Sequence, residues 1–473
     1  MAARLNRASG SGLSTRPWAW ALGLGLLGLL ERLWLWRVYQ AVPYGDTPSY
    51  LRLAGALSSL SLTGYDGTRV PGYPAFLALL GQDPVRVWLA QMALGLAISL
   101  LLFWMTWRTT GILWLGAVLG LLYDVIPGQV LFEANLLTET LTAFLVVLSL
   151  ALLVKLDRQA GAAAGAGGLA ALALGVVASL AGLVRPLFFV LPVWLLPFVW
   201  SAGAGRPAVR LPKILRAAGW LLGRANLRRR LVRTVAFCLG PLLLLGGWIL
   251  WVHDSYGMWS PTTMGGYHWV QHTGSFFEYL PDEVAPLRDT YLRYREAQIA
   301  ERGTQTNAIW EAIPEMSEVS GLGFYDLSRE LQRLSFQLIG EHPDLYLRNV
   351  AEGWVAFWKA PVYWQPEALR ASWAAAPMSA LAWAGRLLSV AANAVFLAMG
   401  GLAVFSARIR SRLGFDRYAL AAGGLVWLVS VVQTLVDHGD NPRFLMPLQM
   451  IVFYVVFRAA AHWVLTRRPG QQA

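Results

Sequence analysis

The chain has 473 residues, of which 56% are hydrophobic and only 14% are charged, and it carries a net charge of +12. A soluble protein of ordinary composition has about 25% charged residues. Apolar runs near the membrane-spanning length of about 20 residues recur along the chain. The composition therefore excludes a soluble globular protein and predicts an all-α polytopic membrane protein. No nucleic-acid motif accompanies the basic charge, so we expect no nucleic-acid partner.

We predict about ten transmembrane helices. The first follows a basic tail that lacks a small-residue cleavage site, so we expect it to be an uncleaved span. Pro127 and Gly128 separate the third from the fourth, which suits a tight hairpin, and the eighth is long enough to tilt. The predicted spans lie near residues 17–37, 86–106, 109–126, 135–154, 163–184, 187–203, 234–252, 377–406, 418–436 and 444–464.

Basic loops predict the orientation of these spans. The N-terminal tail and the 206–233 loop contain basic and no acidic residues, and the 408–417 loop and the C-terminus are also basic. Ten spans place all four on one side, which the positive-inside rule assigns to the cytoplasm, together with both termini. Attraction of the basic loops to anionic membrane lipids is expected. Most acidic residues then lie outside.

The predicted spans divide the chain into three parts. We expect an N-terminal membrane module over residues 1–252, an extracytoplasmic loop subdomain over 253–376 and a C-terminal membrane module over 377–473. The subdomain is expected to act as a small helical lid, because helical patterns recur at residues 285–302, 324–340 and 343–358.

The first outer loop, residues 38–85, is expected to contain a helix that lies on the membrane surface. Thr47 is placed to cap this helix and Pro48 suits its first turn. Apolar residues then recur at helical spacing. Because Thr47 supplies the cap, Asp46 is free to point elsewhere, which makes Asp46 the leading candidate for chemistry.

Cations on the outer face are the candidate partners of Asp46. Arginine and lysine bind phosphate and stabilise its charge as it leaves. The alternative for each is a contact with a lipid headgroup. The candidates are Arg69 in the first loop, Arg185 at the end of the fifth span, Lys359 before the eighth span and Arg443 in the last outer turn.

Glu139 and the 437–443 turn add further candidates. A carboxylate that faces a bundle interior is costly and usually functional, although Glu139 is also suited to a helix start. His438, next to Asp437, suits a proton relay or a metal ligand. No ligand spacing is diagnostic, so we expect no cofactor, with a divalent metal as the alternative. The single cysteine, Cys238, excludes an intrachain disulfide.

The order of these motifs resembles the GT-C superfamily of integral-membrane glycosyltransferases. Within it, the closest resemblance is to the bacterial polyprenyl-phosphate-sugar-dependent group that includes protein mannosyltransferase and aminoarabinose transferase relatives. The matching segments are Gly-Asp-Thr-Pro-Ser-Tyr-Leu at 45–51, Arg-Val-Pro-Gly-Tyr-Pro at 69–74, residues 135–139 at the start of span four, and Asn-Pro-Arg-Phe at 441–444.

The resemblance implies a GT-C-like bundle with Asp46 at its active site. Many relatives carry an Asp-Glu pair where this chain has Asp46 and Thr47, so Glu139 or Asp66 is left to supply a second acid. The implied substrate-binding residues are Arg69, Tyr73, Glu139, Arg185, Lys359, His438 and Arg443.

The implied reaction is inverting transfer of a sugar from a polyprenyl-phosphate donor, on the extracytoplasmic face of a bacterial inner membrane. The acceptor is a hydroxyl or amine of a glycolipid, a polysaccharide or a protein. Asp46 would orient or deprotonate this acceptor. Cations such as Arg69, Lys359 or Arg443 would hold the leaving phosphate.

Three alternatives stay open. An oligosaccharide ligase or polymerase with a diphosphate-linked donor would share the outer-face site. A transporter or flippase of a lipid-linked glycan would need polar residues through the middle of the spans, which are apolar here. A scaffold without enzymatic activity would need none of these residues.

Overall fold

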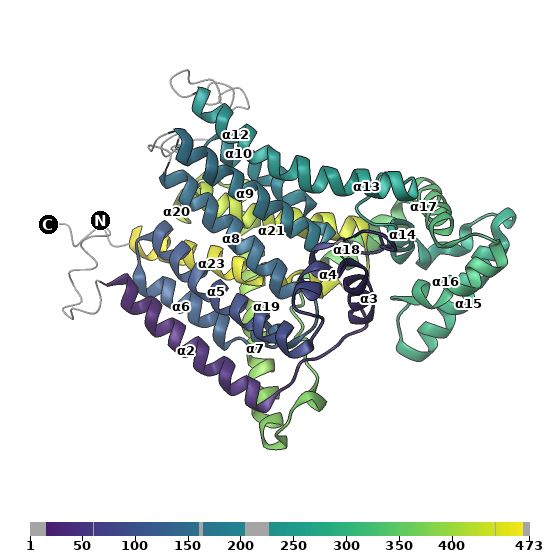
Figure 1. Ribbon diagram of the computed structural model, residues 1–473, viewed down its shortest axis with the longest axis horizontal. Coiled ribbons are helices and arrows are strands. Elements are labelled where there is room, and N and C mark those ends of the chain that lie inside the picture. Colours follow the sequence, from purple (N-terminus) through teal and green to yellow (C-terminus); the bar gives the residue numbers. More distant parts are fainter. Residues whose placement is uncertain (1–15, 60, 160–163, 204–226, 440, 467–473) are drawn as a thin grey trace.

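The computed structural model describes residues 16–466 except 60, 160–163, 204–226 and 440. The described residues form helices and no strand, apart from an isolated bridge between Val42 and Asn135. Figure 1 shows a bundle of long helices, with a group of shorter helices projecting from one end. The predicted all-α architecture is confirmed.

Eight helical segments among the described residues are long and apolar enough to cross a membrane. A ninth results if α6 (Leu113–Val125) and α7 (Pro127–Ala134), which are bent by 54°, count as one span. The eight are built from α2 (Pro17–Val38), α5 (Pro84–Thr110), α8 (Glu139–Arg158), α9 (Ala164–Val184), α12 and α13 (Leu227–Pro241 and Gly247–Tyr256), α19 (Ala375–Phe405), α21 (Arg417–Val436), and α22 and α23 (Asn441–Phe444 and Gln449–Thr466).

The ten predicted spans all fall on helices, but two of them are short. The segment 109–126 contains α6, and 187–203 contains α10 (Val190–Trp200), an apolar helix too short for a regular span. The prediction of a tight hairpin at Pro127 is wrong. Pro127 instead begins α7, since proline is well accommodated in the first turn of a helix, and α7 is almost entirely buried.

One end of the bundle carries the helices of the two longest connecting segments. The first of these segments, residues 38–85, forms α3 (Thr47–Leu57) and α4 (Gly72–Leu79). The second forms α14 (Gly265–Thr273), α15 (Ala285–Arg302), α16 (Ala308–Ser320), α17 (Phe324–Glu341) and α18 (Pro343–Phe357). Helices α15, α17 and α18 lie where the sequence predicts them, whereas α14 and α16 were not predicted.

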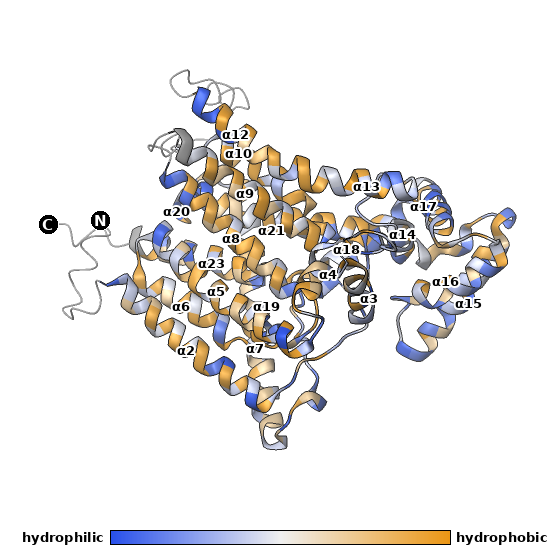
Figure 2. Ribbon diagram, in the orientation of Figure 1, coloured by the Kyte–Doolittle hydropathy of each residue, from blue (hydrophilic) through white to orange (hydrophobic). Residues whose placement is uncertain are grey.

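Helices α14 to α17, called the lid below, have a hydrophobic core of their own. Tyr267, Ile309 and Leu331 are fully buried in it, apart from the core of the bundle. Figure 2 shows the contrast between the apolar bundle and the polar surface of α15 and α17. The lid therefore folds as a water-exposed unit on the end of a membrane bundle.

The described basic segments gather at the opposite end. Arg417, at the start of α21, pairs with Asp157 near the end of α8 at 2.5 Å. Arg458 of α23 pairs with Asp416, and Arg233 of α12 donates to the Ala202 carbonyl at 3.0 Å. Figure 1 shows α20 (Ala407–Arg412) and the start of α12 at this end, away from the lid. The N-terminal tail, the loop up to residue 226 and the C-terminal arginines lie outside the described residues.

A buried ion network joins α2 to the α6–α7 bend. The guanidinium of Arg32 donates to both oxygens of Glu133, at 2.9 and 2.7 Å, and to Asp124 at 2.9 Å. All three side chains are buried. Charges withdrawn from water are costly unless they are paired, so these contacts tie the first span to the bundle.

Arg32→Met should therefore lower the free energy of unfolding by about 3–5 kcal/mol, because it leaves two buried carboxylates without their cation. Denaturant unfolding of the purified protein in detergent micelles measures this. The control is Arg37→Met, which changes an exposed arginine on the same helix and should cost less than about 0.5 kcal/mol. Equal losses in the two variants would contradict the structural role of the network.

Candidate functional site

Asp46 stands at the start of α3 but does not cap it. It occupies the N-cap position without a side-chain cap hydrogen bond. Thr47, expected to be the cap, is instead the first helical residue. Its hydroxyl accepts from the Tyr44 amide at 2.8 Å and donates to the Leu136 carbonyl at 3.0 Å. The prediction for Thr47 is wrong, while the expectation that the Asp46 carboxylate is free for other contacts is confirmed.

Two arginines hold the Asp46 carboxylate. Arg69 Nη2 lies 2.7 Å from Oδ1, and Arg443 Nη1 lies 2.8 Å from Oδ2. Burial alone would raise the pKa of Asp46, but Arg69 and Arg443 outweigh burial and hold that pKa well below its usual range. Asp46 is therefore ionised at neutral pH and is a weak proton acceptor.

Glu139 is the second carboxylate of the site. It is the first residue of α8 and is fully buried. Its Oε1 accepts from Arg185 Nη1 at 2.8 Å and from Arg443 Nε. The Arg185 guanidinium also lies 4.2 Å from the centroid of the Phe444 ring. Arg443 thus bridges both carboxylates, which supports Glu139 as the second acid left open by the sequence.

These five residues, called the ion cluster below, carry one excess positive charge. Three guanidinium groups face two carboxylates. All of them except Glu139 line a cavity of about 1320 Å³ that extends between the bundle and the lid. The side chains of Asp46 and Arg443 are 28% and 14% exposed. An excess positive charge at a partly buried surface attracts anions.

The other predicted site residues do not line this cavity. Tyr73 is buried below it, where its hydroxyl donates to Gln91 at 3.3 Å and its ring packs on Tyr50. Lys359 is exposed after the end of α18. His438 packs against the ring of His272, 5.5 Å between centroids. Among the described residues no group of three His, Cys, Asp or Glu side chains is arranged to hold a metal ion.

The sequence did not indicate the part of the cavity that the lid forms. His268 of α14 lies 3.3 Å from Asp437, which follows α21. Rings of Trp259, Trp269 and Trp310 also line this part, together with Arg329 and Arg333 of α17. His268 and Asp437 come from distant parts of the chain, and no spacing in the sequence indicates that they meet.

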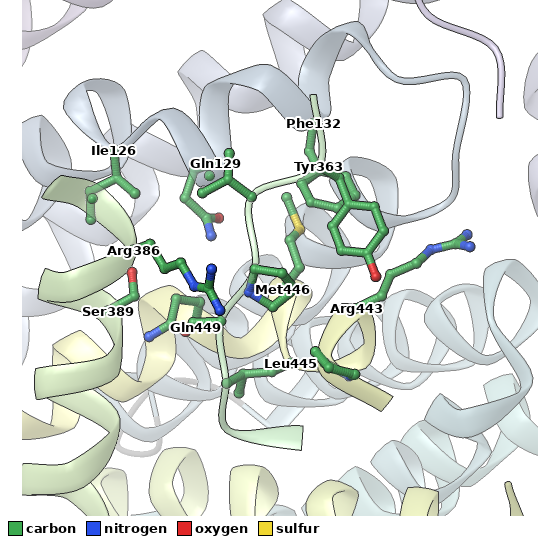
Figure 3. Close-up of a pocket in the computed structure, with 16 residues that line it drawn as sticks. Ile126, Gln129, Phe132, Tyr363, Arg386, Ser389, Arg443, Leu445, Met446 and Gln449 are labelled. Carbon is green, nitrogen blue, oxygen red and sulfur yellow. The ribbon is translucent and has the colours of Figure 1, made fainter. Parts of the chain in front are cut away.

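A second, far smaller pocket adjoins the ion cluster (Figure 3). It lies between α7, α19 and the 360–363 segment, and shares Tyr363 and Arg443 with the large cavity. Figure 3 shows Arg386 directed into this pocket, while the Arg443 guanidinium points away from it. Apolar side chains make up much of the lining: Ile126, Phe132, Val362, Leu445 and Met446.

Comparisons of the chain with protein-family models, with curated proteins and with solved structures found no match.

Glu139→Gln should destabilise the protein by about 3 kcal/mol or more, because it leaves two buried guanidinium groups short of a counter-charge. Thermal unfolding in detergent measures the loss, and added inorganic phosphate should recover part of it by binding the released cations.

The matched control is Arg52→Gln, which breaks the pair between Arg52, 57% exposed, and Asp66. A surface pair of this kind contributes about 1 kcal/mol or less. Equal destabilisation of the two variants, or no effect of phosphate on Glu139→Gln, would contradict the assignment of the ion cluster as a buried anion site.

Proposed function

We propose that this protein is an inverting glycosyltransferase that moves a sugar from a polyprenyl-phosphate donor to an acceptor. The proposal rests on one observation, namely that four separate segments of the chain meet at the ion cluster. Each of the four segments that resemble GT-C enzymes contributes one member of the ion cluster: 45–51 gives Asp46, 69–74 gives Arg69, 135–139 gives Glu139 and 441–444 gives Arg443.

The charge of the ion cluster fits a phosphodiester donor. A sugar linked to a lipid through one phosphate carries one negative charge, which the one excess positive charge neutralises. As the bond between sugar and phosphate breaks, a second negative charge develops on the phosphate. Fixed guanidinium groups stabilise such developing charge without reorganising. Arg69 and Arg443, which face the cavity, are the groups that would hold it.

In this proposal Asp46 positions Arg69 and Arg443 and orients the acceptor. With two guanidinium groups on its carboxylate, its low pKa makes it a weak base.

The proposed location is a bacterial inner membrane with the cavity on the extracytoplasmic face. The described basic segments lie at the end of the bundle opposite the lid. The positive-inside rule assigns that basic end to the cytoplasm. The proposed acceptor is a glycolipid, a polysaccharide or a protein that reaches the cavity from the lid side.

The charge count bears on the alternatives as well. A diphosphate-linked donor, as used by a ligase or polymerase, carries two negative charges and would leave the site with a net negative charge. A flippase would need a polar path along the bundle, whereas the ion cluster and the cavity both lie at one end. Both observations favour transfer from a monophosphate donor.

Asp46→Asn should separate binding from catalysis. Loss of one carboxylate raises the excess charge of the cluster, so polyprenyl phosphate, the lipid product of any such donor, should bind about tenfold more tightly, equivalent to about 1.4 kcal/mol. Sugar transfer should be lost, because Arg69 and Arg443 lose their common anchor. Native mass spectrometry of the protein in nanodiscs, titrated with polyprenyl phosphate, measures the affinity.

Lys359→Gln is the matched control, since it removes an outer-face cation that lies away from the cavity and should leave the affinity unchanged. Tighter binding of polyprenyl diphosphate than of polyprenyl phosphate would move the function to the ligase class. Absence of binding to either lipid would reject the proposed donor.

A further inference from the structure

Glycosyl transfer to a hydroxyl requires a group that accepts a proton. The acceptor oxygen forms a bond to the anomeric carbon while the bond from that carbon to the phosphate oxygen breaks, and the O–H proton must leave. Asp46 and Glu139 are both held by arginine, which lowers their ability to take a proton. The proton acceptor is therefore expected to be another side chain that lines the cavity.

His268 of the lid and Asp437 of the 437–443 turn meet in the cavity. His268 Nδ1 is buried and lies at ion-pair distance, 3.3 Å, from Asp437 Oδ2 without a hydrogen bond to it, while 29% of the side chain is exposed. Both residues line the cavity that contains the ion cluster. With a proton on Nδ1 facing the carboxylate, Nε2 keeps the lone pair that accepts a proton, which is the arrangement of histidine bases in general.

Both side chains are fixed by their surroundings. The Asp437 carboxylate also accepts from the Gly439 amide at 2.8 Å. Burial alone would raise the pKa of Asp437, but His268 and Gly439 outweigh burial and lower it, so the carboxylate stays ionised. The His268 ring packs edge-on against Trp310, 5.4 Å between centroids.

The helix that carries His268 is equally constrained. Gly266 of α14 packs so closely on α17 that a Cβ there would lie 1.7 Å from the Ser328 carbonyl oxygen. The Gly266 amide donates to the Ser328 hydroxyl at 3.2 Å. On the other side, Asp437 and Arg443 belong to the same 437–443 turn. One turn thus supplies both the phosphate-facing arginine and the partner of His268.

We propose that His268 is the proton acceptor for the attacking hydroxyl and that Asp437 is the residue that positions it. This inference rests on the proposed function. The acceptor O–H proton passes to His268 Nε2, the oxygen bonds to the anomeric carbon, and the electron pair of the broken bond stays on the lipid phosphate. The phosphate leaves as a dianion held by the ion cluster, and His268 then releases its proton to water.

Other charged groups surround the pair. Arg329 and Arg333 of α17 line the same cavity, and each pairs with an acidic neighbour, Asp326 and Glu330. His272 lies one turn along α14, against His438. Burial lowers the pKa of His272 to about 4, so His272 is neutral near pH 7. Asp437 is the carboxylate paired with His268 in this cavity.

The first experiment uses full-length protein in nanodiscs with labelled histidine, and records the ring nitrogen resonances of His268, which report whether Nδ1 or Nε2 carries the proton. Asp437→Asn should change the balance between these two ring forms, since it removes the carboxylate that lies 3.3 Å from Nδ1. Added polyprenyl phosphate should shift the same resonances, because it enters the cavity that His268 lines. Resonances of His268 that respond to neither change would overturn the proposal.

The second experiment measures release of polyprenyl phosphate from synthetic polyprenyl-phosphate mannose, glucose, galactose and arabinose, with water as the acceptor. His268→Gln should slow release at least about 100-fold, with little change in binding of polyprenyl phosphate. In Asp437→Asn the fall in rate on the acidic side should shift to lower pH, which a purely structural role would not cause.

His253→Gln is the matched control, because His253 Nδ1 also lies 3.3 Å from a carboxylate, that of Asp254, but outside the cavity. It should leave both the rate and the pH profile unchanged. Retention of the full rate in His268→Gln would overturn the proposal and return the role of base to Asp46. If the protein without substitutions does not bind polyprenyl phosphate, the proposed donor is rejected instead.

Discussion

The pairing of three arginines with two carboxylates is the constraint on which the lid end of this molecule depends. The five side chains come from the N-cap of α3, the loop before α4, the start of α8, the residue after α9, and α22, which are far apart in the sequence. Removal of Glu139 leaves the buried Arg185 without a carboxylate, and such an unpaired charge costs more than most packing contacts contribute. The ion cluster therefore fixes the ends of several spans relative to one another.

The position of the ion cluster explains the shape of the cavity. Its charges lie where the apolar bundle ends, and the lid covers them with a wall of different chemistry, rich in indole rings and carrying His268. The ion cluster and the His268–Asp437 pair thus give the cavity two chemically different parts, and Arg329 and Arg333 add cations on the side of the lid. In the proposed reaction the transferred sugar lies between the ion cluster and His268. Positive charge stabilises the leaving phosphate, whereas negative charge stabilises the side chain that has accepted the proton.

Much of this arrangement could be predicted from sequence, because hydropathy and helical periodicity act locally. The predicted spans fall on helices, and the patterns at 285–302 and 324–340 mark α15 and α17. All five members of the ion cluster could be selected from sequence, Asp46 and Arg69 in the first long loop and Glu139, Arg185 and Arg443 at the ends of predicted spans. What the sequence could not supply were the partners. Arg32 with Glu133, and His268 with Asp437, are pairs created by tertiary packing. Lys359 shows the converse, since its place near the membrane surface does not fix the direction of its side chain.

The single excess charge of the ion cluster also has a kinetic consequence. In the proposed reaction the phosphate arrives as a monoanion and leaves as a dianion, so the same guanidinium groups attract the product more strongly than the donor. Groups that stabilise the developing charge thus also slow the departure of the spent lipid. Departure of that lipid would then be a second slow step of turnover, after bond cleavage. The rate would depend on how quickly the surrounding membrane protonates, dilutes or recycles the carrier.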